Sequence, residues 1–178
     1  ASNDLQIALE RSPSGSVFWC AKGNYKKIRI VKPCEIYGGF DGNEASLEER
    51  DWAANRSVFS SVEISSDALI DGVTFAFPPE GGEVSFNNAD NPTLKNCRFS
   101  KTVSAGPAIL SDGCSSPSLI NCALIDCRAG ASRPSPLILF RSCRNALILN
   151  CTVANSKLSQ AGSPAIGFRD STGEVHNS

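Results

Sequence analysis

The second half of the chain alternates short apolar runs with polar breaks. AIL, SLI, LILF and ALIL are each three or four residues long, and Asn, Gly, Ser and Pro are frequent between them. Runs of this length predict β-strands, because a helix that buries one face needs a longer periodic stretch. The intervening residues favour turns. The pattern therefore predicts an all-β chain of many short strands.

The predicted strands belong to a repeat. GEVSFNNADNPTLKNC, PAILSDGCSSPSLINC and PLILFRSCRNALILNC align without gaps, PAIGFRDSTGEVHNS aligns with one residue fewer, and ALIDGVTF is a degenerate copy. The differences in period fall between the Cys of one segment and the Gly or Pro that opens the next. A constant core with one variable loop per repeat is typical of a solenoid, and three short strands per turn predict a parallel β-helix over residues 1–178.

Residues that share a position in the repeat should form columns along the solenoid. Asn tolerates the left-handed backbone of a sharp bend, and stacked amides can hydrogen-bond from turn to turn. The Cys after each Asn should point inward as a free thiol, because neighbouring strands lie about 4.8 Å apart and a disulfide needs its Cβ atoms closer. Aromatic residues at a third position should stack. The predicted columns contain Asn96, Asn121, Asn150, Asn177, Cys97, Cys122, Cys151, Phe86, Phe140 and Phe168.

The remaining cysteines leave more than one interpretation open. Cys114 and Cys143 align in a bend one turn apart, where the backbone is less constrained, so the pair is either a disulfide or two free thiols. Cys20 and Cys34 should point inward on successive strands, and Cys127 falls in a loop; their redox state is open. With one His and no C-x-x-C motif, the sequence predicts neither a metal site nor a cofactor.

The first part of the chain departs from the regular repeat. Residues 1–15 contain a predicted helix that covers the first turn and so protects its open strand edge. The first turns occupy 16–81, with a polar excursion at 41–57, and regular turns follow over 82–178. We interpret the excursion, despite its five carboxylates, as a turn and clamp rather than a catalytic loop: Arg50 should pair locally and Trp52 should pack back on the coil.

Four segments carry a resemblance to a known family. They are LQIAL at Leu5–Leu9, AKGNY at Ala21–Tyr25, YGGFDGNE at Tyr37–Glu44 and ERDW at Glu49–Trp52. Together with the repeats, they resemble bacterial extracellular right-handed parallel β-helix repeat proteins of the pectate-lyase-like superfamily and their polymorphic outer membrane protein relatives. The resemblance implies a right-handed coil, export, and an extracellular or cell-surface location. It implies little about activity, because architecture rather than chemistry defines the family.

The net charge and the positions of the acidic residues argue against several classes of function. The formal net charge is −1 with no basic stripe, which argues against nucleic acid, and no apolar run approaches the roughly 20 residues of a membrane span. Polysaccharide cleavage would require paired carboxylates, or an acid cluster for Ca²⁺ with a basic residue. The repeats instead offer one acid per turn. Weak candidates for a surface ligand site are Asp112, Arg141 and Arg169 in one column, where Asp112 should pair with Arg141, and Asp126 in a variable loop.

The sequence favours a non-catalytic exported or cell-surface scaffold: an adhesin, a stalk or a subunit of a surface assembly. The alternative is a polysaccharide-binding or polysaccharide-cleaving β-helix protein, and a glycan is accordingly among the expected partners. The repeat is interrupted at Asn177 and Ser178 without a cap. Because a terminal turn needs a cover, we expect either a longer rod or a contact with a protein partner or a second copy there.

Overall fold

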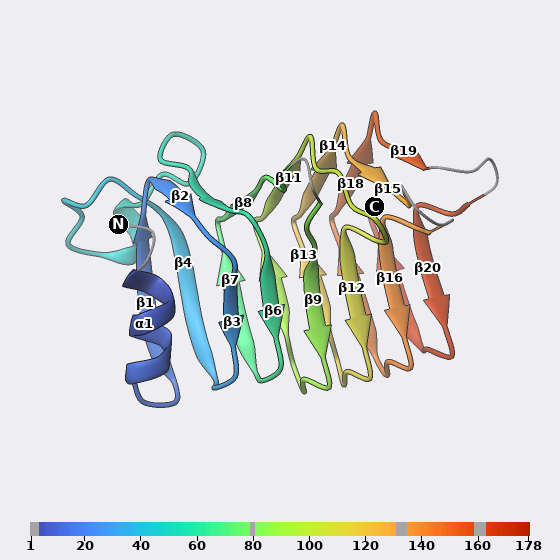
Figure 1. The fold of residues 1–178 in the computed structure, drawn as a ribbon, viewed down its shortest axis with the longest axis horizontal. Helices are drawn as coiled ribbons and strands as arrows, with labels where there is room; N and C mark the ends of the chain where they lie inside the picture. Colours follow the sequence, from blue (N-terminus) through green and yellow to red (C-terminus); the bar gives the residue numbers. More distant parts are fainter. Residues whose placement is uncertain (1–3, 79–80, 131–134, 159–162) are drawn as a thin grey trace.

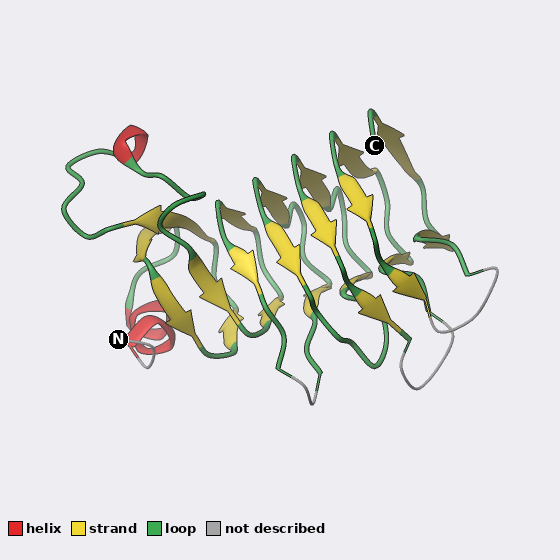
Figure 2. Ribbon diagram, turned by 90° about the horizontal axis from the view of Figure 1, so that it is seen from above, coloured by secondary structure: helices red, strands yellow, loops and turns green. Residues whose placement is uncertain are grey.

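A computed structural model describes residues 4–78, 81–130, 135–158 and 163–178 of the chain. Successive coils each contribute one strand to each of three parallel sheets, and the coils stack along the long axis of the molecule (Figure 1). Viewed from above, the strands of each sheet follow one another in a regular row (Figure 2). The short runs of the repeat therefore form the predicted parallel β-helix.

The strands have the following bounds. The first sheet contains β1 (Ser16–Ala21), β4 (Cys34–Phe40), β7 (Ala68–Asp71), β10 (Thr93–Lys95), β13 (Ser118–Ile120), β17 (Ala146–Leu149) and β21 (Gly173–His176). The second contains β2 (Gly23–Tyr25), β5 (Ser57–Phe59), β8 (Thr74–Phe75), β11 (Arg98–Ser100), β14 (Ala123–Ile125) and β18 (Thr152–Ala154). The third contains β3 (Ile28–Ile30), β6 (Val62–Ile64), β9 (Val84–Asn87), β12 (Ile109–Asp112), β16 (Ile138–Arg141) and β20 (Ile166–Arg169). A separate pair consists of β15 (Arg128–Ala129) and β19 (Lys157–Leu158).

The register of the third sheet follows the repeat. Ser111 pairs with Phe86 on one side and Phe140 on the other, and Phe140 pairs in turn with Phe168. The rings of Phe140 and Phe168 stack with centroids 5.1 Å apart. Phe86 and Phe140 are fully buried, whereas Phe168, in the last coil, is 39% exposed. The predicted aromatic column is therefore present, although Ser111 interrupts it.

The bend between the first and second sheets uses the predicted asparagines. Asn96, Asn121, Asn150 and Asn177 all have φ between 49° and 53°. Asn121 Nδ2 donates to Asn96 Oδ1 at 3.3 Å, and Asn96 Nδ2 donates to Asp71 Oδ1 at 2.8 Å. Within the described residues the amide chain stops there: Asn150 is linked to the next coil by its backbone N–H, which donates to His176 O at 3.0 Å. The side-chain ladder is therefore shorter than the column of bends.

Two further columns of left-handed residues turn the other corners. They are Lys101, Asp126 and Asn155 after the second sheet, and Asn88, Gly113, Ser142 and Asp170 after the third. Their residue types vary, so the repeat alone did not reveal them. Their shared feature is the next residue, which is small: Thr102, Cys127 and Ser156 in one column, and Ala89, Cys114, Cys143 and Ser171 in the other.

Helix α1 (Asp4–Arg11) covers the edge of the first coil. Its residues Leu5 and Leu9 are buried in the core. Gln6 satisfies the open edge of β3 with its amide: Arg29 N donates to Gln6 Oε1 at 2.8 Å, and Gln6 Nε2 donates to Arg29 O at 3.4 Å. An unpaired strand edge invites association with other chains, so this helix gives the solenoid a closed end.

Candidate functional site

The outer face of the third sheet brings three of the four candidate residues into one row. Asp112 on β12 pairs in register with Arg141 on β16, which pairs with Arg169 on β20. Arg141 Nε donates to Asp112 Oδ1 at 2.9 Å, and Arg141 Nη2 donates to Oδ2 at 2.6 Å. These hydrogen bonds hold the pKa of Asp112 below its ordinary value. The predicted pair is confirmed, and its two-pronged geometry is the one that suits a guanidinium and a carboxylate.

The chemistry open to this row is limited. Its members are Asn87, Asp112, Arg141 and Arg169, so it holds one carboxylate, and an arginine already engages that carboxylate. Glycoside hydrolysis uses two carboxyl groups on either side of the scissile bond. A carboxylate with a lowered pKa also cannot act as a general acid near neutral pH. The row thus offers a polar surface rather than a pair of acid–base groups.

Arg141→Gln is expected to cost less than about 1 kcal/mol, because both partners of this ion pair are substantially exposed. It should also let the pKa of Asp112 rise toward its ordinary value. The depressed pKa in the wild type contributes stability above the unfolded pKa, and this contribution is lost as pH falls. Urea unfolding of both proteins at neutral pH and near pH 3 measures it: the variant should show a smaller difference between the two conditions. If wild type and variant showed the same pH dependence, Arg141 would not be the cause of the lowered pKa of Asp112.

The fourth candidate, Asp126, does not join the row. It lies in the bend after β14, at a left-handed position shared with Lys101 and Asn155. Its backbone N–H donates to Ala154 O at 3.1 Å. Asp is among the residues that tolerate this conformation. The position of Asp126 is therefore explained by the corner that it turns.

The polar excursion occupies 41–56 between β4 and β5, with one turn of 3-10 helix, η1 (Leu47–Glu49), and it stands off the coils in Figure 2. Three of its acids bind its own backbone. Glu44 accepts hydrogen bonds from the backbone N–H groups of Asp41, Gly42 and Asn43, which lower its pKa. Glu49 accepts from Ala45 N, and Asp51 accepts from the N–H groups of residues 53 and 54. Carboxylates used in this way fix a loop.

Arg50 ties the excursion to the coils. Its guanidinium lies 3.0 Å from Asp71 Oδ1 and donates to Gly38 O and Asp71 O, each at 3.3 Å. It also lies over the ring of Tyr37, 5.1 Å from the centroid. The pairing predicted for Arg50 was local, within the excursion. The structure corrects the partner: Glu44, Glu49 and Asp51 accept hydrogen bonds from backbone N–H groups, whereas Asp71 is buried and needs a cation.

The excursion also requires glycine in β4. Gly39 has φ +101°, and a Cβ atom there would lie 2.5 Å from Trp52 Cα. The backbone of Trp52 therefore returns directly over the strand, as the clamp interpretation requires, while its side chain remains 44% exposed. No other residue type could accommodate both the conformation and this close approach.

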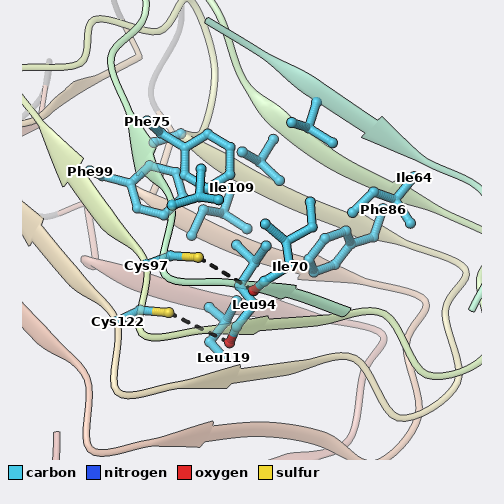
Figure 3. Packing of buried hydrophobic residues seen from close by; sticks show 14 of the residues in the cluster. Ile64, Ile70, Phe75, Phe86, Leu94, Cys97, Phe99, Ile109, Leu119 and Cys122 are labelled. Carbon is cyan, nitrogen blue, oxygen red and sulfur yellow. Dashed lines mark hydrogen bonds between the residues drawn. The ribbon is translucent and has the colours of Figure 1, made fainter. Parts of the chain in front are cut away.

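The cysteines of the predicted column lie in the bends between the first and second sheets, directly after the asparagines. Cys97, Cys122 and Cys151 are buried, and each thiol contacts a backbone carbonyl of the preceding coil (Figure 3): Cys97 Sγ is 3.5 Å from Ile70 O, and Cys122 Sγ is 3.6 Å from Leu94 O. The pKa of the Cys151 thiol is raised, chiefly by its hydrogen bond with the Cys122 thiol and secondly by burial. Ser156 bonds the carbonyl of Leu124 in the same way at a different corner. These side chains therefore act as small groups that join successive coils.

All eight cysteines are free and buried. The open alternative of a Cys114–Cys143 disulfide is therefore not realised. Both side chains are hydrogen-bonded elsewhere: Cys114 Sγ donates to Asp112 O at 3.4 Å, and Cys143 Sγ lies 3.3 Å from Ser111 Oγ. Cys20 and Cys34 are likewise buried thiols, and Cys127, expected in a loop, points into the core with no exposed surface.

Buried thiols predict a loss of stability in alkali. Burial raises the pKa of Cys20 to about 12 and that of Cys34 to about 11. Unfolded thiols release their protons from about pH 8.5 upward. The stabilisation is therefore complete below that pH and is lost as pH rises toward 11–12. Urea midpoints at pH 7.5, 9.5 and 10.5 should fall steadily, and less steeply in Cys20→Ser. A midpoint independent of pH would contradict the burial of these groups as thiols.

Across the four described ranges, no three His, Cys, Asp or Glu residues gather as a metal site would require. In the same part of the chain, no helix has the length and hydrophobicity needed to cross a bilayer.

Comparisons with known proteins address the fold. The family described as the right handed beta helix region matches residues 30–178. No curated protein matches the chain. A solved structure of a candidate glycosyl hydrolase from Parabacteroides merdae is 10% identical, with a TM-score of 0.47; the alignment covers 97% of this chain and 88% of that one. So distant a likeness carries no argument about activity.

Proposed function

The chain belongs to the family of right-handed β-helix regions, and from this premise we propose that it is a non-catalytic scaffold: an adhesin or stalk module, or a subunit of an extracellular or cell-surface assembly. The observation that supports this most directly is the row on the third sheet. Its one carboxylate, on Asp112, is held by Arg141. An enzyme that cleaves glycans by acid–base catalysis needs a second carboxyl group facing the first.

The way the coils are joined also supports a scaffold role. Parallel sheets run through all the coils, left-handed residues turn the corners of the later coils, and buried thiols contact the preceding coil. Three acids of the excursion, Glu44, Glu49 and Asp51, accept hydrogen bonds from backbone N–H groups. Polar groups satisfied in this way make a stiff body, and loops on a stiff body are well suited to recognition. The proposed partner is another protein of the same surface assembly.

Incubation with pectin, alginate and glycosaminoglycans tests the proposal. We expect neither unsaturated nor reducing ends above the buffer control, while a polysaccharide lyase run in parallel releases them. Asp112→Asn serves as the matched variant, since it removes the one carboxylate of the row without changing its shape. New chain ends formed by the wild type and lost in Asp112→Asn would overturn the proposal and establish a carbohydrate-active enzyme.

A further inference from the structure

A small pocket lies beside the bend between the first and second sheets. Its volume is about 80 Å³, and the residues that matter for its chemistry are Trp52, Arg56, Gly72, Thr74, Asn96 and Arg98. Trp52 and Arg56 come from the end of the excursion and Arg98 from β11. The pocket is separate from the Asp112–Arg141 pair, which lies on the third sheet.

The backbone around the pocket is fixed. Gly72 lets the excursion approach, since a Cβ atom there would lie 3.0 Å from Trp52 Cβ and 3.0 Å from Arg50 Nη1. The carbonyl of Arg56 accepts a hydrogen bond from Gly23 N at 3.1 Å, and Arg98 N donates to Val73 O at 2.9 Å. The two arginines therefore project from anchored positions, and the pocket exists before any ligand arrives.

The charge of the pocket is not compensated. The nearest buried acid, Asp71, pairs with Arg50 and accepts a hydrogen bond from the Asn96 amide. No carboxylate lines the pocket. Within the described ranges, Arg56 and Arg98 have neither an ion-pair partner nor a side-chain hydrogen bond, so each guanidinium is available to a ligand.

We propose that this pocket binds the anionic group of an acidic sugar unit in a glycan chain. Guanidinium groups offer a planar fork of donors that fits carboxylate and sulfate. A space of about 80 Å³ suits one such group and not a whole sugar ring. The ring would therefore remain at the rim, where Trp52, at 44% exposure, offers an apolar face for it. Small-ligand sites usually combine a small number of polar groups with an aromatic surface.

Three polymers test the proposal: polygalacturonate, which carries carboxylates, dextran sulfate, which carries sulfates, and unmodified dextran. Binding is measured by isothermal titration at near-physiological salt, with Arg56→Gln/Arg98→Gln as the test variant. Arg128→Gln/Arg144→Gln is the control, since it makes the same change in net charge at two exposed arginines outside the pocket. Arg98→Gln alone is the second test variant if the double variant does not fold.

We expect saturable binding to at least one charged polymer and none to dextran. Each pocket arginine should contribute about tenfold in affinity, so that the test variant loses about 100-fold and the control stays within about twofold. Binding to polygalacturonate alone identifies a carboxylated ligand, and binding to dextran sulfate alone a sulfated one. The proposal is overturned by equal losses in the two double variants, by equal binding of dextran, or by no binding at all. None of these results depends on whether polymer ends are released.

Discussion

Arg50→Ala is expected to lower the free energy of unfolding by about 3–5 kcal/mol, because it leaves the buried carboxylate of Asp71 without its cation. The side chains of Arg50 and Asp71 are only 12% and 5% exposed. The same change removes the hydrogen bonds to Gly38 O and Asp71 O and the contact with the Tyr37 ring. Urea unfolding followed by circular dichroism measures the loss.

A second substitution shows whether the buried charge is the cause. Asp71 pairs in register with Lys95, and its carboxylate accepts a hydrogen bond from the Asn96 amide, so Asp71→Asn places a neutral group of the same shape beside that amide. Arg50→Ala/Asp71→Asn should therefore recover a large part of the lost stability. Arg144→Ala, which removes an exposed arginine, is the control and should change stability by less than about 0.5 kcal/mol. A double variant as unstable as Arg50→Ala would show that the cost arises from lost packing of the excursion.

Phe99→Ala is expected to cost about 3–5 kcal/mol through the cavity that it leaves. Phe99 is fully buried, its ring stacks on Phe75 with centroids 4.6 Å apart, and it meets Phe77 edge-on at 6.2 Å (Figure 3 shows the first pair). The surrounding strands belong to continuous sheets, which restricts the collapse of the cavity. The measurement is the urea midpoint at constant m-value.

Phe168→Ala is the matched control, because it removes the same ring from a position that is 39% exposed. It should cost clearly less than Phe99→Ala, since much of the ring already contacts solvent. Equal losses for the two variants would contradict the burial of Phe99 against Phe75 and Phe77.

The repeat predicted the fold because a solenoid converts sequence period into spatial register. Asn96, Asn121 and Asn150 stand at the same bend, and Asp112 faces Arg141, as their alignment required. The right-handed parallel β-helix with a short N-terminal helix is confirmed by the coils and by the family match over residues 30–178. Contacts of this kind join positions that recur in every repeat, so they can be recognised in a single sequence.

Contacts that do not recur could not be predicted in this way. Arg50 meets Asp71 because an excursion present in one coil folds back across its neighbour, and nothing in the period indicates the route that it takes. The pocket beside Trp52 combines that same excursion with Arg98, 46 positions later in the sequence. Corner residues as different as Lys101 and Ser142 share a backbone conformation but no side-chain chemistry, so the alignment concealed them.

The direction of the pairing between coils has a mechanical consequence. Strands of successive coils lie side by side along the long axis of the molecule (Figure 1), so the hydrogen bonds that join them point along that axis. A pull on the two ends of the chain stretches these bonds in series, and the boundaries between coils yield one after another. Each step would release the length of one coil, so the molecule is expected to lengthen in steps under load.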